Sequence, residues 1–398
     1  MNKPLSNSIT AALPELQAFR RDLHQHPELS FDLPRTAGIV AARLKAFGFD
    51  EVIEGIAKTG VVGILHGKSG PASDAGKRVL LRADMDALPI EETTKAAHAS
   101  QVAGRMHACG HDGHTTMLLG AAQHLAETRN FDGTLVFCFQ PAEELGGGAK
   151  VMIDEGLLER FPVKAAYAAH NWPQMPVGEF GVIHGGAMAS ADGVLITVQG
   201  TGGHAAQPHQ ARDPIVCASA IVANVQSIVS RTISPFDQAV VSITSIHGGE
   251  AWNVIPDQIE MRCNFRSFSE TVSARIEAEL RRICSNTAAA HGCSVQIDRP
   301  PMTPYPPTVN HPAETQLAIE AMTAVAGADK VHQDLQPVMG SEDFAFFLRE
   351  VPGAYVFIGN GDSAALHNPA YDFNDEALGH GISYWIELAQ RSLPAETA

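Results

Sequence analysis

Short apolar runs alternate with helical segments through the first 170 residues of the chain. The strand-like runs are 60–67, 78–88 and 133–141, and the segments with apolar side chains at helical spacing are 8–29, 35–47 and 115–128. Such alternation is typical of an α/β domain whose sheet is largely parallel and covered on both faces. In these sheets, functional sites form beyond the carboxyl ends of the strands.

The order of elements changes at about residue 187. From there the sequence predicts a strand, a helix, two strands, a helix and a strand, which is the βαββαβ order of a ferredoxin-like unit. The proline-rich segment 300–308 is unsuited to a helix or a central strand and indicates a return linker. Helix and strand alternate again from residue 310. We therefore expect one domain formed by 1–186 and 302–398 and an inserted domain formed by 187–301.

The length and net charge of the chain limit the number of domains and the classes of partner that we expect. A chain of 398 residues is long enough for two domains, and its net charge of −16 argues against nucleic acid or an anionic membrane as a partner. No continuous apolar run reaches the ~18–20 residues of a membrane span, and the first residues lack the pattern of a signal peptide. We expect a cytoplasmic protein whose six cysteines are reduced thiols.

The segment HACGHDGH at 107–114 is the strongest chemical signal. Cys109 and His111 offer sulfur and imidazole donors one residue apart, which together with carboxylates suit a transition metal. A buried thiol beside a helix-capping histidine is the alternative, but the local density of histidines favours a metal site. We interpret His107 and His114 as supporting residues.

A pair of glutamates follows a strand in QPAEELGGG at 140–148. Glu143 and Glu144 would supply one metal ligand and one uncoordinated carboxylate that accepts a proton from water. Neighbours in a regular strand face opposite ways, so we expect the following glycines to turn the backbone and aim both side chains inward. The alternative is a solvated acidic loop.

Further candidates lie at the ends of other segments. His170 and His367 are the best remaining nitrogen donors, although a lone histidine is more often structural. Asp84 is placed to orient a ligand histidine, and Asp86 is a weaker candidate. In the inserted domain the polar residues that we expect to contribute to a site are His204, Asn253 and Arg266.

With these motifs in order, the chain resembles the zinc-dependent peptidase and amidohydrolase family that contains hippurate hydrolase, bacterial N-acyl-amino-acid amidohydrolases and plant auxin-conjugate amidohydrolases. The motifs that carry the resemblance span nearly the whole chain: HPELSF at 26–31, RADMDALPI at 82–90, MHACGHDGH at 106–114, QPAEE at 140–144, GGHAAQPH at 202–209, WNVIPD at 252–257, GSEDFAFF at 340–347 and LHNPAYDFND at 366–375.

The resemblance implies a catalytic metal-binding domain and an inserted lid that also serves dimerisation. It implies that a pair of divalent metal ions, with Zn, Mn, Co and Ni all chemically suitable, is bound by Cys109, His111, Glu144, His170 and His367. It further implies that Glu143 is the general base and that His204, from the same or a partner subunit, polarises the scissile carbonyl. Asn253 and Arg266 would hold the substrate carboxylate.

The chain departs from the family pattern at two places. Leu145 stands where relatives often have glycine, and the strand before Arg266 has an unusual sequence, MRCNFRSF. Because Arg262 and Arg266 have the same parity in a strand, alternation does not choose between them. The motif position favours Arg266.

Our interpretation is an amidohydrolase that cleaves N-acyl L-amino acids, including hippurate-like N-aroyl compounds, and forms a dimer or tetramer through the lid. The acyl group is not encoded in any motif, because it depends on the shape of a pocket. Two alternatives stay open: a dipeptidase or aminopeptidase that uses the same site, and a non-catalytic metal-binding relative. Hydrolysis of N-benzoylglycine would exclude the non-catalytic alternative.

Overall fold

The computed structural model describes residues 7–300 and 302–395 as two compact units. Unit 1 comprises residues 7–187, Val309–Gln336 and 343–395, and unit 2 comprises Met188–Thr308 with Pro337–Glu342. The segment Pro337–Glu342 groups with unit 2 because it contacts that unit's strands: the Met339 carbonyl accepts a hydrogen bond from Arg266, and Val338 bridges Met188.

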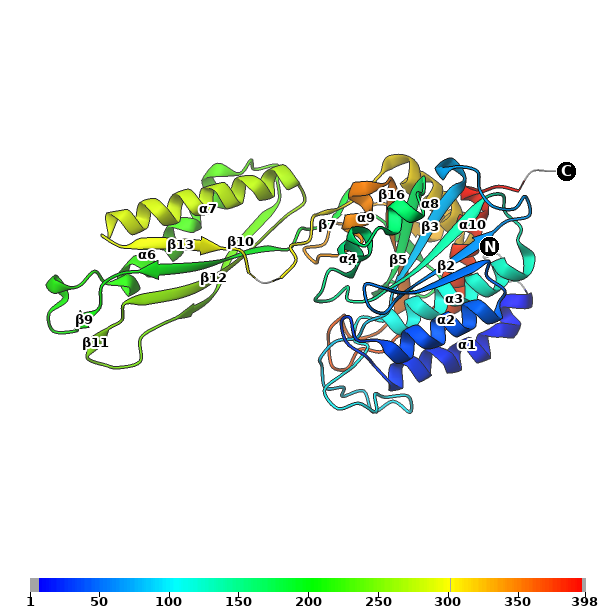
Figure 1. The fold of residues 1–398 in the computed structure, drawn as a ribbon, viewed down its shortest axis with the longest axis horizontal. Helices are drawn as coiled ribbons and strands as arrows, with labels where there is room; N and C mark the ends of the chain where they lie inside the picture. Colours follow the sequence, from blue (N-terminus) through cyan, green and yellow to red (C-terminus); the bar gives the residue numbers. More distant parts are fainter. Residues whose placement is uncertain (1–6, 301, 396–398) are drawn as a thin grey trace. The chain divides into compact units, whose positions relative to one another are not determined.

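Unit 1 is built on a mixed sheet that has eight strands within the described residues (Figure 1). In spatial order they are β1 (Glu51–Ile56), β2 (Gly60–His66), β4 (Thr134–Gln140), β3 (Arg78–Asp84), β5 (Ala165–Pro173), β16 (Gly353–Gly361), β6 (Phe180–Val182) and β15 (Val331–His332). The neighbours from β4 to β16 run parallel, as do β6 and β15, while the remaining pairs are antiparallel. Two short strands, β7 (Gly185–Met188) and β14 (Thr308–Asn310), pair with each other.

Helices cover this sheet because its central strands are apolar on both faces. Every residue of β4 is buried, as are all but the first of β3. The helices of unit 1 are α1 (Asn7–Gln25), α2 (Pro34–Ala46), α3 (His111–Thr128), α4 (Gly148–Asp154), α5 (Leu157–Arg160), α8 (Pro312–Ala326), α9 (Ala345–Glu350) and α10 (Ala377–Ser392). Helix α10 packs against α3 and α8, and α1 lies across α3 and α10.

Unit 2 has the predicted βαββαβ order. Its antiparallel sheet has the spatial order β10 (Ala239–His247), β12 (Gln258–Ser267), β8 (Asp192–Gln199) and β13 (Ser294–Asp298), and its helices are α6 (Pro214–Val225) and α7 (Glu270–Ala290). A small ladder joins β9 (Gly203–His204) to β11 (Val254–Ile255). The predicted α/β domain with a mostly parallel sheet and a ferredoxin-like insert is confirmed.

One described helical stretch, Pro214–Thr232, meets the length and hydropathy of a membrane span by composition alone. Polar residues such as Asn224 interrupt it, which is why the sequence shows no continuous apolar run there. One such helix is weak evidence of a membrane span. Its buried residues include Cys217 and Ile221, which belong to the apolar core of unit 2.

A buried arginine stands in the middle of the central sheet. Arg82 in β3 is 1% exposed, and its guanidinium donates to Gln140 Oε1 at 2.9 Å, Asp84 Oδ2 at 2.7 Å and Asp343 Oδ1 at 2.8 Å. Asp343 also accepts hydrogen bonds from the Gln140 side chain and from the Ala149 backbone N–H. The guanidinium of Arg82 is therefore shared by two buried carboxylates beneath the carboxyl ends of β3 and β4.

Replacement of Arg82 by leucine should cost about 3–5 kcal/mol of unfolding free energy, because Asp84 and Asp343 would remain buried after losing the guanidinium that both contact. Urea denaturation measures the loss. The matched control is Arg78→Leu at the start of the same strand, where one hydrogen bond to the Ala72 carbonyl is lost and about 1 kcal/mol is expected. Equal losses for the two variants would contradict this account.

Candidate metal centre

The candidate site of unit 1 lies beyond the carboxyl ends of neighbouring parallel strands. Asp84 ends β3, the Glu143–Glu144 pair follows β4, and His170 lies in the second half of β5. Cys109 and His111 stand at the start of α3, and His367 lies in the loop after β16. The fold thus brings together side chains from five separate segments.

Two sets of three donor atoms share one sulfur. In one set the donor atoms of Cys109, His111 and His170 lie within 4.8 Å of one another, and in the other those of Cys109, Glu144 and His367 do so. The Cys109 Sγ is 3.3 Å from His170 Nε2, and Glu144 Oε2 is 3.4 Å from His367 Nε2. All five residues predicted as ligands therefore converge, and they form two overlapping triads.

His170 is oriented for ligation by a single hydrogen bond. Its Nδ1 lies 2.6 Å from the Asn171 carbonyl, which accepts only from a protonated nitrogen and so leaves the Nε2 lone pair directed at Cys109. Burial, together with the neighbouring His114, holds the pKa of His170 well below its usual value. His170 is therefore neutral at pH 7, the form that binds a metal.

The backbone turns before the glutamate pair. Ala142 has a φ of 58°, in the left-handed region, and this turn places Glu143 and Glu144 together with His111 in a third group of donors within 4.8 Å. We expected the glycines after Glu144 to turn the backbone; Gly147 is left-handed, with a φ of 65°, but a further turn at Ala142 comes before the pair. A left-handed alanine costs roughly 1–2 kcal/mol, which the surrounding contacts must offset.

Asp86 fixes the glutamate pair. From the sequence alone, Asp86 was only the weaker candidate of the two aspartates. Its Oδ1 accepts from the Glu143 N–H at 3.0 Å, and its Oδ2 accepts from the Glu144 N–H at 3.2 Å. The same Oδ1 lies 3.4 Å from His111 Nδ1. Asp86 thus holds the backbone of both glutamates and lies within ion-pair distance of a ligand histidine. The sequence feature that could have indicated this role is the position of Asp86, two residues after Asp84 and past the end of an apolar strand.

Asp84 and His114 form a support beneath the ligands. His114 Nδ1 lies 2.6 Å from Asp84 Oδ1, and His114 Nε2 accepts from the Asn171 backbone N–H at 2.9 Å. Both nitrogens of His114 are therefore engaged. Asp84 Oδ2 lies farther from the ligand His111, at 3.8 Å from its Nε2. The buried His107 lies outside the donor groups.

The turn that carries Cys109 requires glycine at position 110. Gly110 has a φ of 90°, and a Cβ there would lie 2.3 Å from Asn171 Nδ2 and 2.5 Å from the Tyr371 hydroxyl. Asn171 Nδ2 donates to the Cys109 carbonyl at 2.6 Å, and the Tyr371 hydroxyl donates to Asn171 Oδ1 at 2.7 Å. Sequence reasoning missed Asn171 and Tyr371, because only the fold brings them to this turn.

The chemistry of the donors fits a divalent cation. His111 Nδ1 and Nε2 and Glu144 Oε1 are buried without a hydrogen-bond partner. Burial opposes charge on His111, but the carboxylates of Asp84, Asp86 and Glu144 outweigh it and raise its pKa to about 10. Burial, with the charges of Glu144 and Glu143, likewise raises the pKa of the Cys109 thiol. Bound cations would reverse this excess of buried negative charge.

The candidate residues of the insert lie at two ends of unit 2. His204 and Asn253 are neighbours at the β9–β11 ladder, where the Asn253 carbonyl accepts from the Ala205 N–H. Arg266 stands near the far end of β12, where its Nη1 donates to the Met339 carbonyl at 2.8 Å and its Nε to Asn264 Oδ1 at 3.3 Å. Unit 2 therefore brings His204 and Asn253 together but does not bring Arg266 to them.

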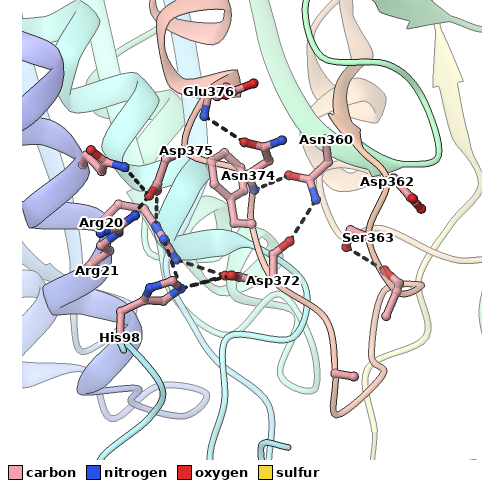
Figure 2. A pocket seen from close by; sticks show the side chains of 14 residues that line it. Arg20, Arg21, His98, Asn360, Asp362, Ser363, Asp372, Asn374, Asp375 and Glu376 are labelled. Carbon is pink, nitrogen blue, oxygen red and sulfur yellow. Dashed lines mark hydrogen bonds and ion pairs between the residues drawn. The ribbon is translucent and has the colours of Figure 1, made fainter. Parts of the chain in front are cut away.

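A surface pocket of unit 1 is bordered by residues of the loop that carries His367. Its volume is 580 Å³, and it is lined by polar residues that include Arg20, Arg21, His98, Asp372 and Asp375 (Figure 2). The five predicted metal ligands are not among its lining residues.

Comparison with known proteins identifies relatives that match most of the chain. Residues 80–391 match the model of peptidase family M20/M25/M40. The chain is 41% identical to hippurate hydrolase of Campylobacter jejuni, over 95% of this chain and 97% of that protein. It is 39% identical to N-acetylcysteine deacetylase of Bacillus subtilis, over 93% and 94% of the two chains.

A solved structure of a Bacillus subtilis protein, described as a dinuclear metal binding peptidase of the M20 family, shares the fold. Its TM-score is 0.81 at 35% identity, over 96% of this chain and 98% of that one. The resemblance inferred from the motifs is thereby confirmed. The chain belongs to peptidase family M20/M25/M40 and is an amidohydrolase of the type represented by hippurate hydrolase and N-acyl amino acid deacylases.

Proposed function

We propose that this protein hydrolyses the amide bond of N-acyl L-amino acids, releasing a carboxylic acid and a free amino acid. The observation that carries the proposal is the pair of donor triads that share Cys109, with the Glu143 carboxylate beside them. The names of the hippurate hydrolase and N-acetylcysteine deacetylase relatives support an N-acyl amino acid as the substrate class.

Cys109, His111, Glu144, His170 and His367 would hold two divalent ions. The dinuclear site of the Bacillus subtilis relative supports this number. Such ions act as Lewis acids that polarise the scissile carbonyl and acidify the attacking water. Glu143, which is 7% exposed, would accept the proton of that water and deliver it to the leaving amine. Asp86 would keep Glu143 in reach, because it binds the Glu143 backbone N–H.

Arg266 would bind the substrate carboxylate. Among the described residues of unit 2, its contacts use Nη1 and Nε, so Nη2 remains to donate to an anion. A guanidinium held by a backbone carbonyl on one side is well placed for a charge-assisted hydrogen bond on the other. This local cation would allow a chain of net charge −16 to bind an acid.

His204 and Asn253 would act on a substrate that Arg266 of another copy holds. The Gln258 end of β12 lies by the β9–β11 ladder, because the adjacent Asp257 binds the Gly202 N–H. Arg266 follows Gln258 by eight residues along a strand, or about 26 Å at ~3.3 Å per residue. Since one N-acyl amino acid is far shorter than that, we propose a homo-oligomer, formed through unit 2, in which the two groups come from different copies.

Two glutamine variants should separate the proposed roles of the glutamates. Glu143→Gln should retain metal and lower kcat on N-benzoylglycine or N-acetyl amino acids by ~10²–10⁴, as for a lost general base. Glu144→Gln should lower the metal content measured by elemental analysis. The exposed Glu159→Gln is the control. Exchanged phenotypes would reverse the assignment, and full activity of chelator-treated, metal-free enzyme would refute the proposed mechanism.

Metal binding should release protons. At pH 7 the metal-free protein holds a protonated Cys109, whose pKa is raised, and a protonated His111, whose pKa is about 10. Both must lose a proton to ligate, so about two protons per chain should be released and affinity should rise with pH. Titration calorimetry of Zn²⁺ in buffers with different ionisation enthalpies counts these protons. Heats that do not depend on the buffer would contradict the assigned ligands.

Arg266→Ala should lower kcat/KM for N-acyl amino acids, through KM, by a factor that corresponds to about 2–5 kcal/mol, because the charge pair between the guanidinium and the substrate carboxylate would be lost. The wild type should prefer the acid over its neutral amide, and the variant should lose that preference. Arg262→Ala, on the same face of β12 but exposed, is the matched control. Equal hydrolysis of the acid and its amide by the wild type would show that Arg266 does not bind the substrate carboxylate.

A further inference from the structure

One buried arginine of α1 contacts acidic residues from two distant segments. The Arg20 side chain is fully buried, with its Nη1 3.3 Å from Asp112 Oδ2 and its Nε donating to Asp375 Oδ1 at 2.8 Å. Its Nη1 also lies 3.6 Å from Asp372 Oδ1. Figure 2 shows the guanidinium of Arg20 directed toward Asp375 and Asp372.

These acidic residues belong to the segments that carry metal-ligand candidates. Asp112 directly follows His111 at the start of α3, and its side chain is fully buried. Asp372 and Asp375 follow His367 in the loop that precedes α10. His111 belongs to one donor triad and His367 to the other. Arg20 thus joins the segment that contains His111 to the loop that contains His367.

The link matters because the loop is only partly packed. Phe373 is buried and points inward, but the other side of the loop borders the 580 Å³ polar pocket. Across that pocket the loop is joined to α1 by the ion pairs of Asp375 with Arg20 and Arg21. Hydrogen bonds and ion pairs, rather than apolar packing, therefore fix this side of the loop.

Arg21 offers a natural comparison. Its Nε donates to Asp375 Oδ2 at 2.8 Å, the same carboxylate that Arg20 contacts. The Arg21 side chain is 44% exposed, and within the described residues its ion pair is with Asp375 rather than with Asp112. Arg21 therefore binds the loop from outside without joining it to α3.

We infer that Arg20 is a positioning residue that sets the spacing between His111 and His367 by joining Asp112 to Asp372 and Asp375. The inference rests on the proposed metal centre. A side chain that orients ligands in this way contributes to metal affinity without touching metal or substrate. The predicted consequence is specific: loss of Arg20 loosens the His367 loop and weakens metal binding.

The test uses metal-free full-length Arg20→Met and Arg21→Met with Zn²⁺ alone as the probe. Competition with a chromophoric chelator should show affinity for Zn²⁺ weakened by about 10- to 100-fold in Arg20→Met, and by less than about twofold in Arg21→Met. Amide hydrogen exchange of residues 362–376 in the metal-free protein should accelerate in Arg20→Met. In turnover of an N-acyl amino acid, kcat should fall while KM stays near that of the wild type.

If Arg20→Met fails to fold, Arg20→Lys tests the same inference. Lysine keeps the buried positive charge but replaces a planar fork by a single ammonium, so Zn²⁺ affinity should still fall. Unchanged Zn²⁺ affinity and loop exchange in a folded Arg20 variant would overturn the inference, as would an equal loss in Arg21→Met. The binding data need no substrate: a wild type that binds two ions but hydrolyses nothing would refute the proposed function alone.

Discussion

Buried negative charge is the constraint on which the rest of unit 1 depends. The carboxyl groups of Asp84, Asp86 and Glu143 are all buried at one edge of the sheet. Such groups are tolerated in a protein interior only when cations and hydrogen bonds compensate them. Arg82 provides this compensation beneath the site, where it binds Asp84 and Asp343. The two donor triads above it provide places for further positive charge.

Rigid support of the donors explains the rest of the site. The Asn171 carbonyl fixes the tautomer of His170, its side chain holds the Cys109 carbonyl, and Tyr371 in turn holds Asn171. Asp86 fixes the glutamate pair through two backbone N–H groups. Because the Cys109 turn and the glutamate pair are held by residues from other segments, their geometry depends on the fold rather than on local sequence.

The geometry of unit 2 is relevant to the proposed assembly of several copies of the chain. A continuous strand separates Arg266 from the ladder that carries His204 and Asn253. A strand cannot bend back on itself to bring its ends together, so the length of β12 supports a division of labour between copies of the chain. This division would make substrate binding depend on assembly, and with it the specificity of the enzyme.

The sequence by itself determined the elements and the reactive residue types. Apolar periodicity indicates the alternating strands and helices and the βαββαβ insert, because burial on one face or two imposes those patterns on local sequence. The spacing of Cys109 and His111 and the adjacency of Glu143 and Glu144 are likewise local, so the order of residues alone indicates their chemistry.

Only the tertiary structure decided how these residues are held. The turn at Ala142, the twofold role of Asp86 and the support from Asn171 and Tyr371 arise from contacts between segments far apart in the chain. The link from Arg20 to Asp112 and Asp375 spans more than 350 residues of sequence. No local pattern records such pairings, because they are selected by the packing of whole elements and not by the preferences of neighbouring residues.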